Sequence, residues 1–345
     1  MKNDNPDNKK KKSKLLIGIT MGDPCGIGPE IILKSLRSSA IKNSAHYVII
    51  GSERVLEWTA KNLKIPIKYQ TISHISEIQD SKFPVSLLST GDFDTSLIKQ
   101  KKPTPEGGEQ SVQWVIKGIN LAMCGYIDAL VTAPVCKESI HLGGYGYPGH
   151  TEMLRIFSGV KRVVMFMVGG KIRVAFVTTH IAIKDVPGLI AEKDVLETIM
   201  ISNDNLKKYF QIHKPRIAVC GLNPHAGEEG IFGDEERKVI VPAIAKAKKK
   251  GIRCEGPVSA DTVFYKVMKG AYDTVVVMYH DQGAIPLKLH AFETGVNITL
   301  GIPFVRTSPD HGTAYDIAGK GVANPHSMME AIKMAVRLSN YMKRR

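Results

Sequence analysis

Long hydrophobic runs are absent from this sequence of 345 residues. A helix that crosses a bilayer needs roughly 20 consecutive apolar residues, and no stretch approaches that length without charged residues. The lysine-rich start leads directly into a short strand-like run at Leu15, without the apolar core of a signal peptide. We therefore expect a protein of the cytoplasm that has no membrane partner.

Paired cysteines are also missing. Cys25, Cys124, Cys136, Cys220 and Cys254 are odd in number, widely scattered and never separated by only two residues. This spacing argues against a disulfide framework and against a zinc site made of thiolates. We expect these cysteines to be buried or incidental.

Aromatic residues make up only 7% of the chain, and acidic residues are too few to balance a net charge of +14. A surface for nucleic acid would interleave basic residues with stacking aromatics. Here six lysines gather in residues 1–14, and further clusters lie at residues 246–250 and 343–345. These clusters are typical of solvated faces, so we expect no nucleic-acid partner and a disordered basic tail over residues 1–14.

Apolar residues are plentiful, at 43% of the chain, and the length suggests about two domains. Strand-like runs alternate with helical patterns, which predicts parallel sheets covered by helices and an α/β fold. The predicted strands occupy residues 15–20, 46–51, 85–88, 129–132, 163–168, 174–178, 216–220 and 274–278. The predicted long helices occupy residues 110–124, 193–210, 235–250 and 327–343.

A glycine-rich loop, Gly22-Asp-Pro-Cys-Gly-Ile-Gly-Pro29, follows the first predicted strand and begins a helix, for which Pro29 is a suitable first-turn residue. It is not a dinucleotide fingerprint, because Ile31 stands where the third glycine would be. The loop is either a tight turn alone or a contact to a ligand.

The segment from Tyr272 to Pro325 concentrates polar residues after an apolar run. A strand followed by Tyr279-His280-Asp281-Gln282-Gly283 places polar groups at its carboxyl end, where ligands bind in open α/β sheets. Further polar residues follow in settings typical of loops, namely Lys288, Asn297, Arg306, His311, Asp316 and Asn324. We predict that this segment forms much of an active site.

Three histidines, His180, His225 and His280, each follow directly after the carboxyl end of an apolar run. Because such ends line one rim of a parallel sheet, the three imidazoles can converge on one divalent cation. Alternatively, each histidine only caps or covers its own loop.

Beside a metal site, an active site of this kind could contain an anion-binding group and a proton acceptor. Lys288 and Arg306 can hold phosphate or carboxylate, although either could instead be a surface ion-pair partner. Asp281 and Asp261 are the candidates for the proton acceptor. Each could also have a supporting role, Asp281 by orienting His280 and Asp261 by bracing its loop.

Six motifs occur in a fixed order: Gly149-His-Thr-Glu152, Asn223-Pro-His-Ala-Gly227, Ala260-Asp-Thr262, Met278-Tyr-His-Asp-Gln-Gly283, Gly295-Val-Asn-Ile-Thr-Leu-Gly301 and Arg306-Thr-Ser-Pro-Asp-His-Gly-Thr-Ala314. With them, the chain from about Leu15 to its last helix resembles the 4-hydroxythreonine-4-phosphate dehydrogenase family of pyridoxal phosphate biosynthesis. Cys136 departs from the pattern, since asparagine is common there in the family.

The resemblance implies that His180, His225 and His280 bind one divalent metal, such as zinc, magnesium or cobalt. It further implies a homodimer with the site at its interface and ligands from both subunits. The implied contacts to a small phosphorylated substrate are His150, Thr151, Lys288, Asn297 and Arg306.

Residues 311–325 are similar to the adenosine-binding loop of isopropylmalate and isocitrate dehydrogenases. The similarity implies NAD or NADP bound without a Rossmann fingerprint, with Asp316 at the ribose hydroxyls and Asn324 at the adenine. The other implied contacts are His311, Gly312, Thr313, Ala314 and Ile317.

Both resemblances imply two α/β/α domains with a cleft between them, as in the isocitrate and isopropylmalate dehydrogenases. Residues 15–140 with 305–345 would form the first domain and carry the cofactor loop. Residues 141–304 would form the second domain, with the metal ligands and the dimer interface.

The implied reaction is oxidation of 4-phosphohydroxy-L-threonine at C3, followed by decarboxylation to 3-amino-2-oxopropyl phosphate. Relatives with the same histidines oxidise D-threonate or D-erythronate 4-phosphate, and the motifs do not distinguish the substrates. A nucleic-acid-binding protein that had kept the fold and lost catalysis would show a damaged site. All three histidines and both anion-binding candidates are intact here, so we predict an enzyme.

Overall fold

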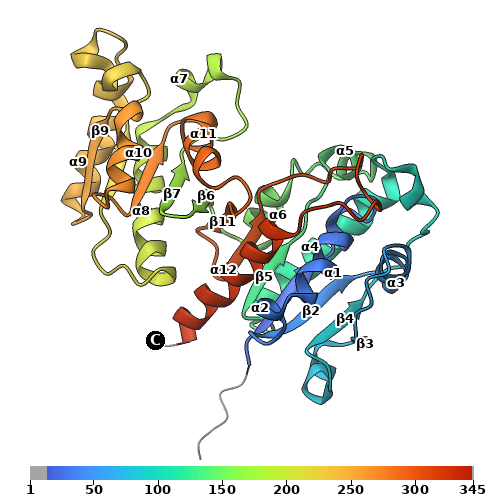
Figure 1. Ribbon diagram of the computed structural model, residues 1–345. Helices are drawn as coiled ribbons and strands as arrows, with labels where there is room; N and C mark the ends of the chain where they lie inside the picture. Colours follow the sequence, from blue (N-terminus) through green and yellow to red (C-terminus); the bar gives the residue numbers. More distant parts are fainter. Residues whose placement is uncertain (1–13, 344–345) are drawn as a thin grey trace, which may run out of the picture.

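The computed structural model describes residues 14–343, so the basic tail predicted at residues 1–14 lies outside the described residues except for Lys14. Twelve strands form a single mixed sheet (Figure 1). They are β1 Leu16–Thr20, β2 His46–Gly51, β3 Gln70–Ile72, β4 Val85–Ser89, β5 Ala129–Thr132, β6 Val164–Gly169, β7 Ile172–Phe176, β8 Ile217–Cys220, β9 Cys254–Val258, β10 Thr274–Val277, β11 Val296–Leu300 and β12 Val305–Pro309.

Helices connect most of these strands. The α-helices are α1 Gly28–Arg37, α2 Ser39–Lys42, α3 Glu53–Asn62, α4 Pro105–Met123, α5 Lys137–Leu142, α6 His150–Phe157, α7 Val186–Leu189, α8 Glu192–Tyr209, α9 Val241–Lys249, α10 Ala260–Met268, α11 His280–Ala291 and α12 His326–Lys343. Shorter helical turns are η1 Ile75–Asp80, η2 Leu97–Gln100, η3 Ile183–Asp185, η4 Pro224–Gly230 and η5 Glu236–Ile240. Within residues 14–343, none of the helices is long and apolar enough to cross a bilayer.

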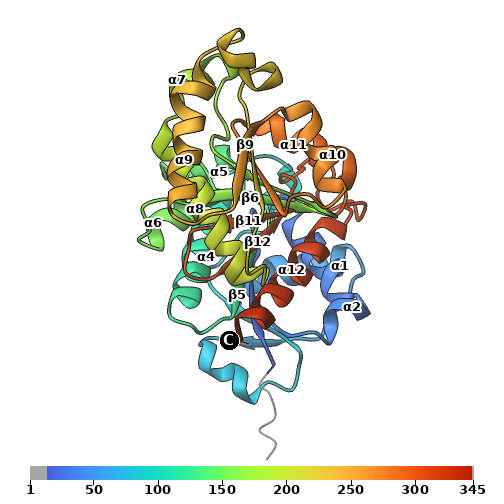
Figure 2. The same cartoon turned by 90° about the vertical axis from the view of Figure 1, so that its left-hand side faces the viewer.

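The predicted α/β class is confirmed. Figure 2 shows α4, α8 and α9 on one side of the strands and α1, α10, α11 and α12 on the other. The strand order is β3-β4-β2-β1-β5-β12-β11-β6-β7-β10-β8-β9. In Figure 1, β2, β3, β4 and β5 lie in one lobe, and β6, β7 and β9 lie in a second lobe.

The expectation of purely parallel sheets is wrong at the centre. Strand β11 is antiparallel to both β12 and β6, and β6 is antiparallel to β7. Only Gly170 and Lys171 separate β6 from β7, too few residues for the crossover that parallel strands require. Gly170 has a φ of +56°, which suits such a tight hairpin turn.

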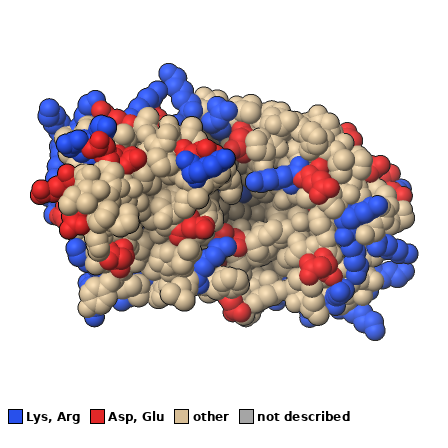
Figure 3. Space-filling model, turned by 90° about the horizontal axis from the view of Figure 1, so that it is seen from above, with Lys and Arg blue, Asp and Glu red and all other residues tan. Residues whose placement is uncertain are grey.

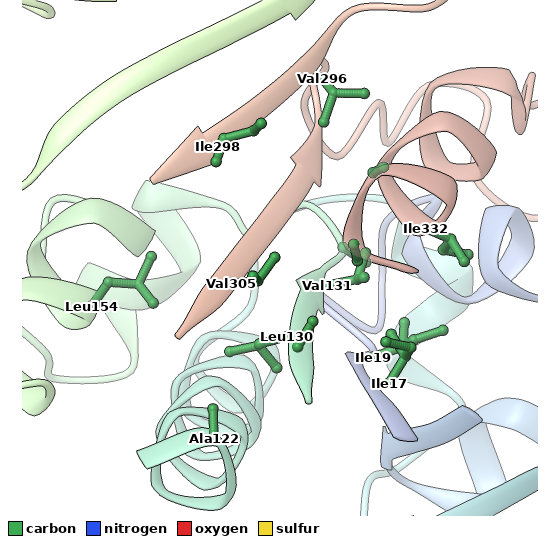
Figure 4. Packing of buried hydrophobic residues seen from close by; sticks show 14 of the residues in the cluster. Ile17, Ile19, Ala122, Leu130, Val131, Leu154, Val296, Ile298, Val305 and Ile332 are labelled. Atoms are coloured by element: carbon green, nitrogen blue, oxygen red, sulfur yellow. The ribbon is translucent and has the colours of Figure 1, made fainter. Parts of the chain in front are cut away.

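The interior of the first lobe is apolar on both faces of the sheet. Ile17 and Ile19 of β1 and Leu130 and Val131 of β5 have no exposed surface. Figure 4 shows Ile17, Ile19 and Val131 on the side of Ile332 of α12, and Leu130 on the other side, toward Ala122 of α4. A strand covered on both faces needs an unbroken apolar run, which is why both strands can be predicted from the sequence.

The division into domains at residues 140 and 304 is retained as a proposal. Helix α6, which begins at His150, packs against α4 of the first lobe. Helix α12 packs against β5, β12 and α1. On β12, Thr307 faces α12, and the opposite face, which carries Arg306, borders the cavity where the polar residues gather.

Candidate active site

A cavity of about 720 Å³ lies between the two lobes, on the face of the sheet formed by β12, β11 and β6. The space-filling view in Figure 3 shows the molecule hollowed between its lobes, with charged residues of both signs around the hollow. Eight of the 17 predicted site residues line this cavity, namely His150, Thr151, His180, His280, Lys288, Asn297, Arg306 and His311.

Arg306 lies in the floor of the cavity and is 3% exposed. It belongs to β12, where side chains alternate between faces. Thr307 bonds to the carbonyl of Ala331 in α12, so Arg306 points to the opposite side. Its guanidinium donates to hydroxyls, to Thr132 Oγ1 at 2.6 and 3.2 Å and to Thr299 Oγ1 at 3.0 Å.

No carboxylate in residues 14–343 forms an ion pair with Arg306, and burial lowers the pKa of the guanidinium to about 9. The group still carries its charge at neutral pH. A buried cation without a partner is strongly unfavourable. A bound anion would supply the negative charge that the described residues do not place beside the guanidinium.

His150 stands beside this cation at the start of α6. Its Nε2 is enclosed but has no hydrogen-bond partner among the described residues. Burial, and secondarily the charge of Arg306, lower its pKa well below the usual 6.5. The backbone N–H groups of the first helical turn also lack partners within the helix and favour an anion. Arg306, His150 and the start of α6 thus give this end of the cavity a chemistry suited to an anion.

Lys288 and Asn297 lie on regular elements, contrary to the expectation of loops. Lys288 belongs to α11, and its Nζ lies 3.4 Å from Asp310 Oδ2. Asn297 belongs to β11, where side chains alternate between faces. Strand β11 was missed although its apolar and polar residues alternate as in a half-buried strand. Strand β12 was missed because most of its residues are polar.

Asp310 is a cavity residue that the sequence analysis did not single out. Burial raises the pKa of its carboxyl, and the nearby Lys288 partly opposes this shift. Its position between Arg306 and His311, within a recognised motif, was the available indication. Lys137 and Glu152 also line the cavity and were not predicted as site residues.

His180 and His280 follow the neighbouring parallel strands β7 and β10, and their ring centroids are 5.9 Å apart. His280 Nδ1 is 2.8 Å from Asp281 Oδ1, which leaves Nε2 free. Burial, Lys137 and His280 lower the pKa of His180, and the neutral imidazole is the form that binds metal. The pair therefore has the chemistry of two metal ligands, with Asp281 in the orienting position.

His225 and Asp261 lie apart from this pair. Neither lines the cavity, and the His225 ring is 6.5 Å from that of Phe232. A hydrogen bond from Ser259, at 2.5 Å, and to a smaller extent the proximity of His225 lower the pKa of Asp261. Within one chain, no three His, Cys, Asp or Glu side chains of residues 14–343 are placed to hold a metal ion.

The turn that carries His225 has an unfavourable backbone. Residues 225–229 all have positive φ, between 40° and 80°, and only one of them is glycine. Such angles cost on the order of 1 kcal/mol or more for each non-glycine residue. Glu236, which is 5% exposed, holds the start of the turn by accepting from the N–H groups of Leu222 and Asn223 at 2.7 Å each. Strain that is maintained in this way is characteristic of functional positions.

The loop similar to an adenosine site leaves the cavity at His311 and runs across the first lobe. Gly312 and Asp316 are exposed, and no atom lies within 4 Å of where a Cβ on Gly312 would be. The backbone there is open to a ligand. Asn324 is already engaged, because its Oδ1 accepts from His326 N at 3.0 Å and so caps α12.

Thr313, Ala314 and Ile317 lie on the inner side of this loop. The carbonyl of Thr313 accepts from Ile27 N at 2.9 Å, and Ala314 and Ile317 pack against the core. The glycine-rich loop makes this approach possible, since a Cβ on Gly26 would lie 2.9 Å from Thr313. Of its two possible roles, the structure favours a tight turn that supports the neighbouring loop.

Comparison with known proteins identifies the family. The family described as pyridoxal phosphate biosynthetic protein PdxA matches residues 43–335. The chain is 43% identical to a 4-hydroxythreonine-4-phosphate dehydrogenase of Geobacter metallireducens, over 95% of this chain and 96% of that protein. It is 42% identical to a D-threonate 4-phosphate dehydrogenase of Cupriavidus necator, over 94% of this chain and 97% of that protein.

Among solved structures, a 4-hydroxythreonine-4-phosphate dehydrogenase of Klebsiella pneumoniae is similar with a TM-score of 0.87 and 38% identity, covering 95% of this chain and 98% of that one. The resemblance inferred from the six motifs is thus confirmed. The chain belongs to the PdxA family and is an enzyme of that family.

Proposed function

We propose that the enzyme oxidises 4-phosphohydroxy-L-threonine at C3 with NAD or NADP and a divalent metal, and that decarboxylation then yields 3-amino-2-oxopropyl phosphate. The observation that carries the proposal is the buried, unpaired Arg306 beside His150, in a cavity whose mouth holds His180 and His280. This arrangement suits a small substrate with an anionic end and a hydroxyl to be oxidised.

Two cationic groups of the cavity suit the two anionic ends of such a substrate. Arg306, with the start of α6, would bind one end, and Lys288 would bind the other. Thr151 in the first turn of α6 and Asn297 in β11 add hydrogen-bonding groups along the wall. The substrate would thereby be held across the sheet with its middle carbons near the two imidazoles.

His180 and His280 would hold the metal together with His225 of the partner subunit. When bound, such a cation supplies Lewis acidity toward the C3 oxygen, and NAD or NADP supplies the hydride acceptor. Asp281 would keep the proton on Nδ1 of His280, so that Nε2 stays available. Asp261 would reach the site with the partner subunit's His225, where it is the candidate proton acceptor.

A homodimer is part of the proposal because one chain does not bring His225 to the other two histidines. Exposed apolar side chains support association of the second lobe. Ile285 and Leu289 of α11 and Phe292 directly after its end form a stripe, with exposures of 63%, 89% and 76%. Such a stripe on a helix is typical of a surface that another chain covers.

Oxidation of D-threonate 4-phosphate is the second candidate, because a relative of nearly equal identity carries that name. The two substrates differ at C2, where the first has an ammonium group and the second a hydroxyl. Glu152 and Asp310 place carboxylates in the cavity, and a carboxylate favours the ammonium. This charge arrangement supports 4-phosphohydroxy-L-threonine as the substrate.

The deciding experiment measures NADH and NADPH formation by the purified enzyme with a divalent metal, on each of the two substrates. We expect a higher kcat/KM for 4-phosphohydroxy-L-threonine and loss of activity after metal removal. A strong preference for D-threonate 4-phosphate would assign the second function instead. Full activity in metal-free buffer would contradict the role of the histidines.

A further inference from the structure

Two buried carboxylates belong to the first strand–helix unit, and both are directed at the loop of residues 311–325. Asp23 precedes α1 and is 0% exposed, and Glu30 in its first turn is 2% exposed. Figure 1 shows this loop running above α1. Buried carboxylates require hydrogen-bond partners. Here several of the donors belong to a segment about 290 residues later in the chain.

Glu30 and Lys34 together bind the backbone of the far end of the loop. Glu30 Oε1 accepts from Ala323 N at 2.9 Å and Oε2 from Gly321 N at 3.4 Å. Lys34 Nζ, 2.7 Å from Glu30 Oε1, donates to the carbonyls of Gly321 and Ala323 at 2.8 Å each. The pair therefore satisfies both donors and acceptors of the same two loop residues.

The near end of the loop is held by the residues before α1. Asp23 Oδ2 accepts from the Tyr315 hydroxyl at 2.7 Å, and Ile27 N donates to the carbonyl of Thr313 at 2.9 Å. Between the two anchors lies the stretch 316–320, which begins with the exposed Asp316. The loop is thus fixed at both ends, and between them Asp316 and Lys320 are exposed whereas Ala318 is buried.

We infer that Glu30 and Lys34 are positioning residues for dinucleotide binding, which hold the loop in the shape in which Asp316 and the backbone near Gly312 meet the adenosine portion of NAD or NADP. The inference rests on the proposed function, which places that portion at this loop. Glu30 and Lys34 are together called the clamp. Because the clamp orders the loop before the cofactor binds, binding does not have to supply the free energy of ordering. Weakening the clamp should therefore reduce cofactor affinity without changing any group that touches the phosphorylated substrate.

The test uses Lys34→Met in the full-length enzyme. Lys34→Arg is the conservative variant because it retains donors for the two carbonyls. Lys193→Met is the matched control, since Lys193 also forms an i,i+4 pair with a glutamate, Glu197, but on α8. Affinity is measured directly by titration with NADH and NADPH, so that the result does not depend on which substrate the enzyme oxidises.

The fluorescence of Trp58 can report the position of the loop. A Cβ on Gly319 would lie 3.5 Å from its ring, so the indole packs beside the loop. The only other tryptophan, Trp114, is 0% exposed and is protected from a soluble quencher. Acrylamide quenching of the cofactor-free enzyme therefore measures how closely the loop covers Trp58.

For Lys34→Met we expect the Kd for the preferred dinucleotide to rise roughly tenfold, because two hydrogen bonds from a charged donor are lost. We also expect stronger quenching of Trp58 and a change of less than about twofold in the KM for the phosphorylated substrate. Lys34→Arg should lie between wild type and Lys34→Met, and Lys193→Met should match wild type.

Unchanged quenching and unchanged Kd in both Lys34→Met and a second variant, Glu30→Gln, would overturn the clamp. Stronger quenching with unchanged Kd would overturn its role in cofactor binding and would locate the error in the proposed cofactor site. Loss of affinity in the Lys193→Met control would overturn the inference as well, because the effect would not be specific to the loop.

Discussion

The Arg306 end of the cavity and the His225 turn are both incomplete, but in opposite ways. Arg306 is buried, its hydrogen bonds come from the same chain, and it lacks only an anion. His225 is exposed on a strained turn, and the two histidines that would share its metal lie in a cavity it does not line. The first site can be completed by a small molecule. Under the proposed function, the second would be completed by another chain.

The largest expected effect on activity comes from removing His225 from one chain and His280 from another. His225→Ala and His280→Ala enzymes should each be inactive as homodimers. Mixed after unfolding and refolding together, they should regain about a quarter of wild-type activity, because half of the dimers are hybrids with one intact site of two. Activity per chain is measured across mixing ratios. If mixtures stay inactive, the shared site is wrong.

Arg306→Met tests the first region. We expect kcat/KM to fall by about 10³, since a buried guanidinium–anion contact contributes several hydrogen bonds to a charged group. We also expect the free energy of unfolding to rise by about 1–2 kcal/mol, because an unpaired buried charge is removed. Steady-state kinetics and urea denaturation measure the two effects.

Arg216→Met is the control for that variant, because Arg216 is paired with Asp273 at 3.1 Å. It should retain activity and lose stability. If Arg306→Met proved less stable than wild type, Arg306 would be an ordinary structural residue and the anion site would lose its main support.

Glu236→Ala tests how the His225 turn is held. The variant loses a buried acceptor of two backbone N–H groups, so we expect the free energy of unfolding to fall by about 2–3 kcal/mol. Glu77→Ala is the control, because Glu77 accepts from Ser73 N and His74 N in an exposed position and should lose less than about 1 kcal/mol. Equal losses in urea denaturation would show that burial of Glu236 adds nothing.

The smallest expected effect is the contribution of His150 to the pH dependence of stability. Its pKa is lowered in the folded chain, so below pH 6.5 the unfolded chain takes up a proton that the folded chain does not. Stability contributed by this residue should therefore be lost as pH falls, by up to about 1.4 kcal/mol per pH unit. His46 and His180 act in the same direction. The informative quantity is thus the difference in slope between wild type and His150→Gln, and identical slopes between pH 5 and 7 would contradict the prediction.

Many residues of the candidate site could be predicted from sequence because each motif specifies the residue types that the chemistry needs. Lys288, Asn297 and Arg306 were singled out before their elements were known, and the structure brings them to one cavity. Their elements were misjudged, although Asn297 lies in a run, Val296-Asn-Ile-Thr-Leu300, whose apolar and polar residues alternate as in a half-buried strand. Asp310 and Glu236 were missed because a lone carboxylate has no pattern of its own.

By itself, the sequence determined the α/β class, the apolar strands on either side of the centre of the sheet and the residue types available for chemistry, because these depend on local composition and periodicity. Only the tertiary structure decided that β11 lies antiparallel to both β6 and β12 and that Arg306 has no carboxylate partner among the described residues. It also decided that His225 stays apart from His180 and His280 within one chain. The physical reason is that strand pairing, burial and the direction of a turn depend on contacts between residues distant in the chain, which no local pattern encodes.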